Sequence, residues 1–125
     1  MLSMANSVKS FQDLVVWQKA MELVTEIYKV SQKFPKEEMF GLTSQIRRAA
    51  VSIPSNIAEG RGKSSKGEFQ QFLYHARGSL AEVETQLLIA INLGFIKNEE
   101  VTHIIQLIAN VGRLLHGLIA AIKKK

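Results

Sequence analysis

The chain contains no cysteine and only two prolines in 125 residues. The absence of cysteine excludes disulfides, thiolate catalysis and cysteine-ligated zinc, and it suits a reducing compartment such as the cytoplasm. The first ten residues, MLSMANSVKS, lack a basic region followed by an apolar run, so we expect no secretory signal there. Uninterrupted apolar runs are far shorter than the roughly 18 residues that a membrane span needs. We therefore expect a soluble cytoplasmic protein that does not contact a membrane.

Acidic residues are fewer than basic residues in this chain. The chain has 16 Lys and Arg against 11 Asp and Glu, which gives a formal net charge of +5. Such a balance favours anionic partners, and nucleic acid is one of them. Part of the excess is the terminal run Lys123 to Lys125, which could simply complement the dipole of a helix end. With 46% hydrophobic residues, a chain of this length can bury a core as one domain.

Apolar residues recur at helical spacing in four segments, and no segment reads as a strand. The first segment ends before Pro35, because a residue that precedes proline is pushed out of the α region. Ser65 and Glu68 form a capping box before the third segment, Gly94 closes it, and Asn98 caps the fourth. The four predicted helices cover about residues 11–33, 40–59, 65–93 and 98–122.

The connections between these helices are short. Helices of this length joined by tight turns must run antiparallel to their sequence neighbours, which predicts an all-α, up-down-up-down four-helix bundle. We expect residues 10–125 to form this single domain and residues 1–9 to be a disordered N-terminal segment. The second helix contains Pro54, which lacks the N–H that would bond to the Ala50 carbonyl and usually bends a helix. We predict a bend near Pro54, because the polar and apolar rows keep phase across it; the alternative is a break after Ile53.

A row of polar residues runs along the second helix beside its apolar face, at spacings of three and four. The third helix carries a similar row that includes Ser79 and Glu82. One interpretation is a structural hydrogen-bond network that fixes the register of the two helices, with Arg48 held by Glu82 or another acid. The other is a groove or oligomer pore that contacts a ligand. The row on the second helix comprises Gln45, Arg48, Ser52, Asn56 and Glu59.

The stretch GRGKSSKGEF is the best candidate for binding phosphate. Arg61, Lys63 and Lys66 surround the start of the third helix, whose first N–H groups carry a partial positive charge. The spacing of the glycines is not that of a P-loop, and no strand precedes it. The alternative is a solvated turn whose helix is capped by Ser65.

Two adjacent arginines in the second helix face different directions. Arg47 and Arg48 point about 100° apart, so we do not expect them to serve one function. We expect Arg47 to lie outside the bundle, where it is available to bind phosphate. We expect Arg48 to lie inside the bundle.

No pattern in the sequence indicates catalysis. His75, His103 and His116 fall at no metal-ligand spacing, and the Glu-x-x-His pairs of di-iron bundles do not occur. Glu82 and Glu84 project about 200° apart on one helix and cannot share a proton. We therefore expect no enzymatic activity, no metal and no cofactor.

Three stretches, DLVVWQ, FGLTSQIRRAAVSIPSNIAEG and ARGSLAEVETQL, resemble the bacterial four-helix bundle family called 23S ribosomal RNA intervening-sequence proteins. The likeness covers about residues 10 to 95 and implies a small cytoplasmic bundle with no established enzymatic activity. It also suggests a homo-pentameric ring, as in the related accessory variability proteins of diversity-generating retroelements. Those relatives associate with a reverse transcriptase and bind nucleic acid through a basic surface. The hallmark positions that match, without a proven role, are Arg48, Ser52, Asn56, Glu59 and Gly60.

These features together predict a non-enzymatic, homo-oligomeric four-helix bundle. We expect it to bind RNA or DNA, or a nucleic-acid-processing partner, through a basic surface. The alternative function is a protein–protein scaffold that docks another protein and whose positive charge is incidental.

Overall fold

The computed structural model describes residues 10–123, which form four long helices and contain no strand. The all-α class and the four predicted helices are confirmed. The predicted N-terminal segment 1–9 and the last two lysines lie outside the described residues. The helices are α1 (Val15–Ser31), α2 (Leu42–Arg61), α3 (Lys66–Asn92) and α4 (Thr102–Lys123), with short 3-10 turns η1 (Phe11–Asp13), η2 (Lys36–Glu38) and η3 (Asn98–Val101).

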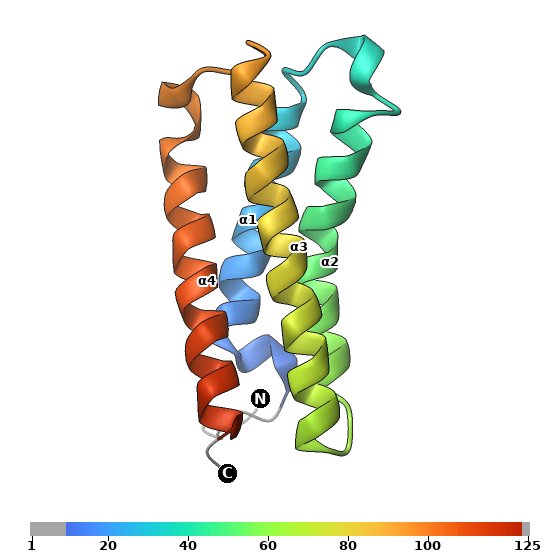
Figure 1. Ribbon diagram of the computed structural model, residues 1–125, viewed down its shortest axis with the longest axis vertical. Helices are drawn as coiled ribbons and strands as arrows, with labels where there is room; N and C mark the ends of the chain where they lie inside the picture. Colours follow the sequence, from blue (N-terminus) through green and yellow to red (C-terminus); the bar gives the residue numbers. More distant parts are fainter. Residues whose placement is uncertain (1–9, 124–125) are drawn as a thin grey trace, which may run out of the picture.

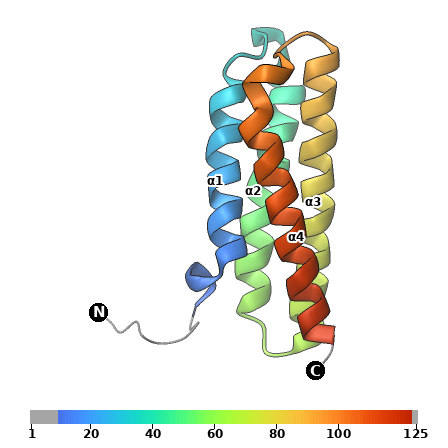
Figure 2. The same cartoon turned by 90° about the vertical axis from the view of Figure 1, so that its left-hand side faces the viewer.

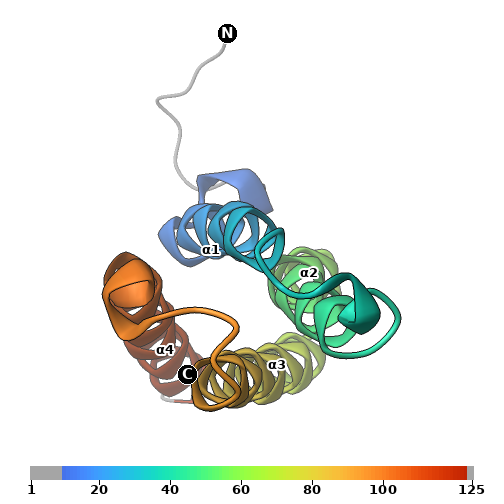
Figure 3. The same ribbon diagram turned by 90° about the horizontal axis from the view of Figure 1, so that it is seen from above.

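The helices surround a common core (Figure 3), in which α1 packs against α2 and α4, and α3 packs against the same two helices. Successive helices are connected at alternate ends of the bundle (Figure 1). The α1–α2 and α3–α4 connections therefore share one end, while the α2–α3 turn lies at the other. Figures 1 and 2 show that α4 ends at the same end of the bundle as the α2–α3 turn.

Each helix contributes one side to the core. In α1, for example, Ala20, Leu23 and Ile27 are completely buried, and they follow one another at spacings of three and four. The same periodicity predicted the helices, so the core follows directly from the sequence pattern. The largest fully buried side chains are Leu23, Ile27, Ile46, Ile53, Ile57, Leu73, Leu87 and Leu115.

Among the described residues, one segment is long and apolar enough to cross a membrane by length and composition alone. This segment, Asn98–Lys123, has a mean hydropathy of 1.5 over its most apolar stretch. A core helix of a soluble bundle passes the same test. In α4 a stripe that includes Ile104, Val111 and Leu115 is buried within the bundle, and 33% of the most apolar stretch is buried.

Three helix starts differ in detail from the prediction. Ser10 caps η1 rather than a long helix, so α1 begins at Val15. Asn98 opens η3, and α4 follows only at Thr102. At the start of α3 the Ser65 hydroxyl accepts from the Glu68 backbone N–H at 3.1 Å, as predicted. The Glu68 carboxylate, however, accepts from that same hydroxyl at 3.2 Å, and not from the Ser65 backbone.

Gly94 ends α3 as predicted, in a left-handed conformation with φ of 79°. The Phe95 N–H donates to the Ala90 carbonyl at 2.9 Å, and the Gly94 N–H donates to the Ile91 carbonyl at 3.0 Å. This pair of bonds is the Schellman motif, which satisfies carbonyls that the helix end leaves free. Glycine adopts this backbone conformation without the steric cost that a side chain adds.

Helix α2 is continuous through Pro54, which is buried in its interior. The alternative of a separate short helix after Ile53 is therefore wrong. The bend that the sequence predicts near Pro54 stays a prediction.

One ion pair links the two connections at the same end of the bundle. Lys33 Nζ lies 2.6 Å from Glu100 Oε2, and the Lys97 backbone N–H donates to Glu100 Oε1 at 2.8 Å. The hydrogen bond from Lys33, followed by that from Lys97, lowers the pKa of Glu100. Because both side chains are well exposed, this pair contributes little to stability.

Candidate functional site

The centre of the polar row forms a hydrogen-bonded seam between α2 and α3. Ser52 Oγ lies 2.9 Å from Ser79 Oγ. Asn56 Nδ2 donates to the Ser52 hydroxyl at 2.9 Å and to the Ser52 carbonyl at 2.8 Å. All three residues are half-buried. This polar seam, which comprises Ser52, Asn56 and Ser79, joins the two helices by side-chain contact.

The rest of the predicted network lies outside the seam. Gln45, Glu59 and Glu82 are exposed, and so is Arg48. Arg48 and Glu82 line one small hollow of about 280 Å³ between α2 and α3, yet no ion pair joins them within residues 10–123. Within these residues the predicted pairing of Arg48 with Glu82 or another acid is therefore absent, because Arg48 points into solvent.

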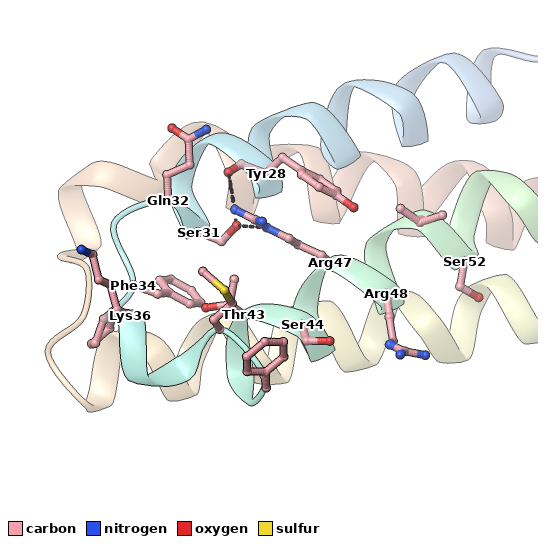
Figure 4. Close-up of a pocket in the computed structure, with 14 residues that line it drawn as sticks. Tyr28, Ser31, Gln32, Phe34, Lys36, Thr43, Ser44, Arg47, Arg48 and Ser52 are labelled. Carbon is pink, nitrogen blue, oxygen red and sulfur yellow. Dashed lines mark hydrogen bonds between the residues drawn. The ribbon is translucent and has the colours of Figure 1, made fainter.

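The two arginines occupy the reverse of their predicted positions. Arg47 is half-buried and reaches α1 (Figure 4), where its Nε donates to Ser31 Oγ at 2.8 Å and its Nη2 donates to the Tyr28 carbonyl at 3.4 Å. Its guanidinium also lies 4.7 Å from the centroid of the Tyr28 ring. The prediction that Arg47 lies outside and Arg48 inside is wrong, because α1 supplies hydrogen-bond acceptors and an aromatic face on the side where Arg47 points.

The seam makes a test of coupling between α2 and α3. We expect Ser52→Ala and Ser79→Ala each to lower the free energy of unfolding by about 1 kcal/mol, because each leaves a half-buried hydroxyl without its partner. The double variant should lose less free energy of unfolding than the two single variants lose together, because neither hydroxyl is left without its partner. Urea unfolding measures all three, with the exposed Ser55→Ala on the same helix as a control. Strictly additive losses would show that the two hydroxyls are not coupled.

A groove of about 870 Å³ opens between α1 and α2 at the end where these helices are connected (Figure 4). Its lining combines exposed apolar residues, polar side chains and three cations, and it contains no Asp or Glu. Phe40 is the most exposed of these apolar residues, at 95%, and its neighbour Met39 is 57% exposed. This α1–α2 groove is lined by Tyr28, Ser31, Gln32, Phe34, Pro35, Lys36, Met39, Phe40, Thr43, Ser44, Arg47, Arg48, Val51 and Ser52.

The predicted phosphate-binding turn lies at the opposite end of α2. Arg61 occupies the last turn of α2 and is half-buried, whereas Lys63 and Lys66 are exposed. The Lys63 ammonium lies 5.4 Å from the centroid of the Phe72 ring, which holds it close to α3. The structure thus brings the three predicted cations to one turn.

Two further cations join this end of the bundle. The Arg77 guanidinium lies 4.9 Å from the centroid of the Tyr74 ring, and the Lys123 ammonium at the end of α4 lies 5.9 Å from the same ring. Because α4 ends at the same end of the bundle as the α2–α3 turn (Figure 2), Lys123 lies close to Tyr74 of α3. The basic end of the bundle therefore comprises Arg61, Lys63, Lys66, Arg77 and Lys123.

The sequence did not predict the α1–α2 groove, and it did not place Arg77 and Lys123 at the basic end. The spacing of three between Tyr74 and Arg77 was a usable signal, because such residues are neighbours on a helix surface. The aromatic Phe40, in a connection where no helical period accounts for it, was a signal for the groove. Nothing in the sequence places Lys123 beside Tyr74, since that contact depends on how α4 packs.

Comparison with known proteins gives one family and one fold. A solved structure, a protein of unknown function from the S23 ribosomal protein family of Bacteroides thetaiotaomicron, is 26% identical in sequence. The alignment covers 84% of this chain and 98% of that one, with a TM-score of 0.77. A search of curated proteins gives no match. The family model described as 23S rRNA-intervening sequence protein matches residues 12–117. The chain belongs to the 23S rRNA-intervening sequence protein family.

Proposed function

We propose that this protein is a non-enzymatic, homo-oligomeric helical bundle of the cytoplasm that binds nucleic acid through its basic end. The observation that carries the proposal is the gathering of cations from the end of α2, the α2–α3 turn, α3 and α4 at one end of the bundle. The name of the family, which refers to an intervening sequence of 23S rRNA, supports RNA as the ligand.

The geometry of the basic end suits a phosphate backbone better than a single small anion. From Lys66 to Arg77 the cations extend over about 16 Å of α3, at a rise of about 1.5 Å per residue. Neighbouring aromatic rings hold Lys63, Arg77 and Lys123 along this stretch without neutralising their charge. Cations spread in this way displace condensed counterions from a polyanion, which gives affinity without reading its sequence.

We further propose a homo-pentameric ring and a relationship to the accessory variability proteins of diversity-generating retroelements, with a reverse transcriptase as a candidate partner. Four large apolar side chains support self-association, because they are 41–59% exposed in the single chain. They lie in α3, at the residue that directly follows α3, and in α4. The mass of the protein in solution tests the ring. These side chains are Leu88, Ile89, Leu93 and Ile105.

The proposed function is tested by titrating a structured RNA at several salt concentrations. We expect affinity to fall by at least tenfold between about 50 and 200 mM salt, because bound cations release counterions from the phosphates. Fluorescence anisotropy of a labelled RNA measures the dissociation constants, and an unrelated bundle of equal net charge is the control. Binding no tighter than that control would favour the alternative of a protein–protein scaffold.

A further inference from the structure

The most exposed large apolar side chain in the described part of the chain is Phe40, at 95%. It lies between η2 and α2 and lines the α1–α2 groove, together with Tyr28, which is 41% exposed. Single exposed apolar residues are common and need no explanation. Here, however, Phe40 lines a groove that also contains Tyr28 and the buried Phe34, and its exposed ring offers a face on which a flat ring can stack.

The charge of the α1–α2 groove has one sign. Lys36, Arg47 and Arg48 line it, and no acidic residue does. Arg47 is held in place by Ser31 and Tyr28. Arg48 is exposed, has no hydrogen bond or ion pair within the described residues, and points away from Arg47 (Figure 4). Of these three cations, Arg47 is therefore fixed, whereas the hydrogen-bonding capacity of Arg48 is available to an anion.

Polar side chains also line the groove. Gln32, Thr43 and Ser44 supply amide and hydroxyl groups that can both donate and accept hydrogen bonds. A volume of about 870 Å³ lies within the range of small-ligand sites. An unpaired base and its phosphate are recognised by groups of these kinds, which are aromatic faces for stacking, cationic side chains, and hydrogen-bond donors and acceptors.

We propose that the α1–α2 groove binds an unpaired nucleotide, with its base stacked on Phe40 and its phosphate at Arg48. This inference rests on the proposed function, because the ligand is nucleic acid, but it assigns a second contact far from the basic end. The two sites lie near opposite ends of α2, which has 20 residues and is about 30 Å long. A duplex can bind the basic end, whereas only a single strand or a loop presents a base face to the groove.

The groove is tested with a labelled 12-nucleotide oligouridylate and a labelled 12-base-pair RNA duplex. We expect Phe40→Ala to weaken binding of the single strand by about tenfold, because the stacking face is removed, and to leave binding of the duplex unchanged. Phe40→Trp should restore the affinity. Arg48→Ala should weaken single-strand binding and lower the slope of log K against log salt by about 0.7, the value for one phosphate contact.

The matched control is Val15→Ala, which removes an apolar side chain that is 55% exposed and lies outside the α1–α2 groove. Helical circular dichroism should be unchanged in every variant, because each replaced side chain is exposed. Competition by uridine monophosphate tests whether the groove binds a free nucleotide or only a nucleotide within a strand. Displacement of the labelled strand shows that the groove also accepts the free nucleotide.

Two results separate this inference from the proposed function. If the parent protein binds neither RNA, the proposed function fails and the groove assignment fails with it. If the parent binds both RNAs and Phe40→Ala binds the single strand as tightly as the parent, the groove assignment alone is overturned. An equal loss for strand and duplex would also overturn it, since stacking on an unpaired base cannot affect a duplex.

Discussion

Gly60→Ala is expected to lower the free energy of unfolding by about 2–3 kcal/mol, the upper part of the range for overpacked cores. An added Cβ would lie 2.6 Å from Phe72 Cβ, 3.1 Å from Phe69 Cδ1 and 3.3 Å from the Phe69 carbonyl oxygen. Two of these atoms belong to the α3 backbone or are bonded directly to it. Because a side-chain rotation cannot move these two atoms away, α2 and α3 would have to separate at their point of contact.

The control for this prediction lies two residues away. At Gly62 the nearest atoms to an added Cβ are 3.6 and 3.8 Å away, which is ordinary van der Waals contact, and its φ of −81° suits any residue. We expect Gly62→Ala to be neutral or to stabilise the protein by up to about 1 kcal/mol through the unfolded state. Guanidinium unfolding followed by circular dichroism compares the two. Equal midpoints for Gly60→Ala and the parent protein would contradict the close approach of α2 and α3.

The close approach at Gly60 also bears on the proposed binding site. Gly60 directly precedes Arg61, and Phe72, which it contacts, holds the Lys63 ammonium. A side chain at position 60 would therefore move the turn that carries the basic end. The match of Gly60 to a hallmark position of the family has a physical reason here, because only glycine lets α2 approach α3 at this point.

The periodicity of the sequence was sufficient to predict the fold class and the four helices. In α2, for example, Ile46, Ile53 and Ile57 recur at helical spacing and are all buried, and such a stripe is recognisable from the local pattern alone. The end of α3 was predictable for a similar reason, since Gly94 is the residue type that a left-handed helix cap requires. Helical periodicity and a glycine cap involve residues close together in the sequence, so they can be recognised from a single amino-acid sequence.

The direction of individual polar side chains was not predictable in the same way. A helical wheel places Arg47 and Arg48 about 100° apart, but it does not say which neighbouring helix each one faces. The outcome depends on the acceptors that Ser31 and Tyr28 present from α1. The groove at Phe40 arises similarly from the packing of α1 against α2, which no local pattern records.

Replacing Arg61, Lys63 and Lys66 together with alanine is expected to weaken RNA binding by about a hundredfold at 50 mM salt. Without these three cations, three phosphates of a single-stranded RNA keep their counterions, which should reduce the slope of log K against log salt by about 2. Anisotropy titrations over a salt series measure both quantities. The helical circular dichroism should persist, because Lys63 and Lys66 are exposed and the polar seam is untouched.

The matched control removes three other cations and therefore lowers the net charge of +5 by the same amount. Lys19, Lys29 and Lys33 each form an ion pair with a glutamate, so their charges are already partly neutralised. Their triple replacement with alanine should change the slope by less than about 1, the effect of general charge alone. If the two triple variants lose affinity equally, the positive charge of the whole protein governs binding and the basic end is not the site. If only the variant at the α2–α3 turn loses it, the arrangement of the cations matters more than their number.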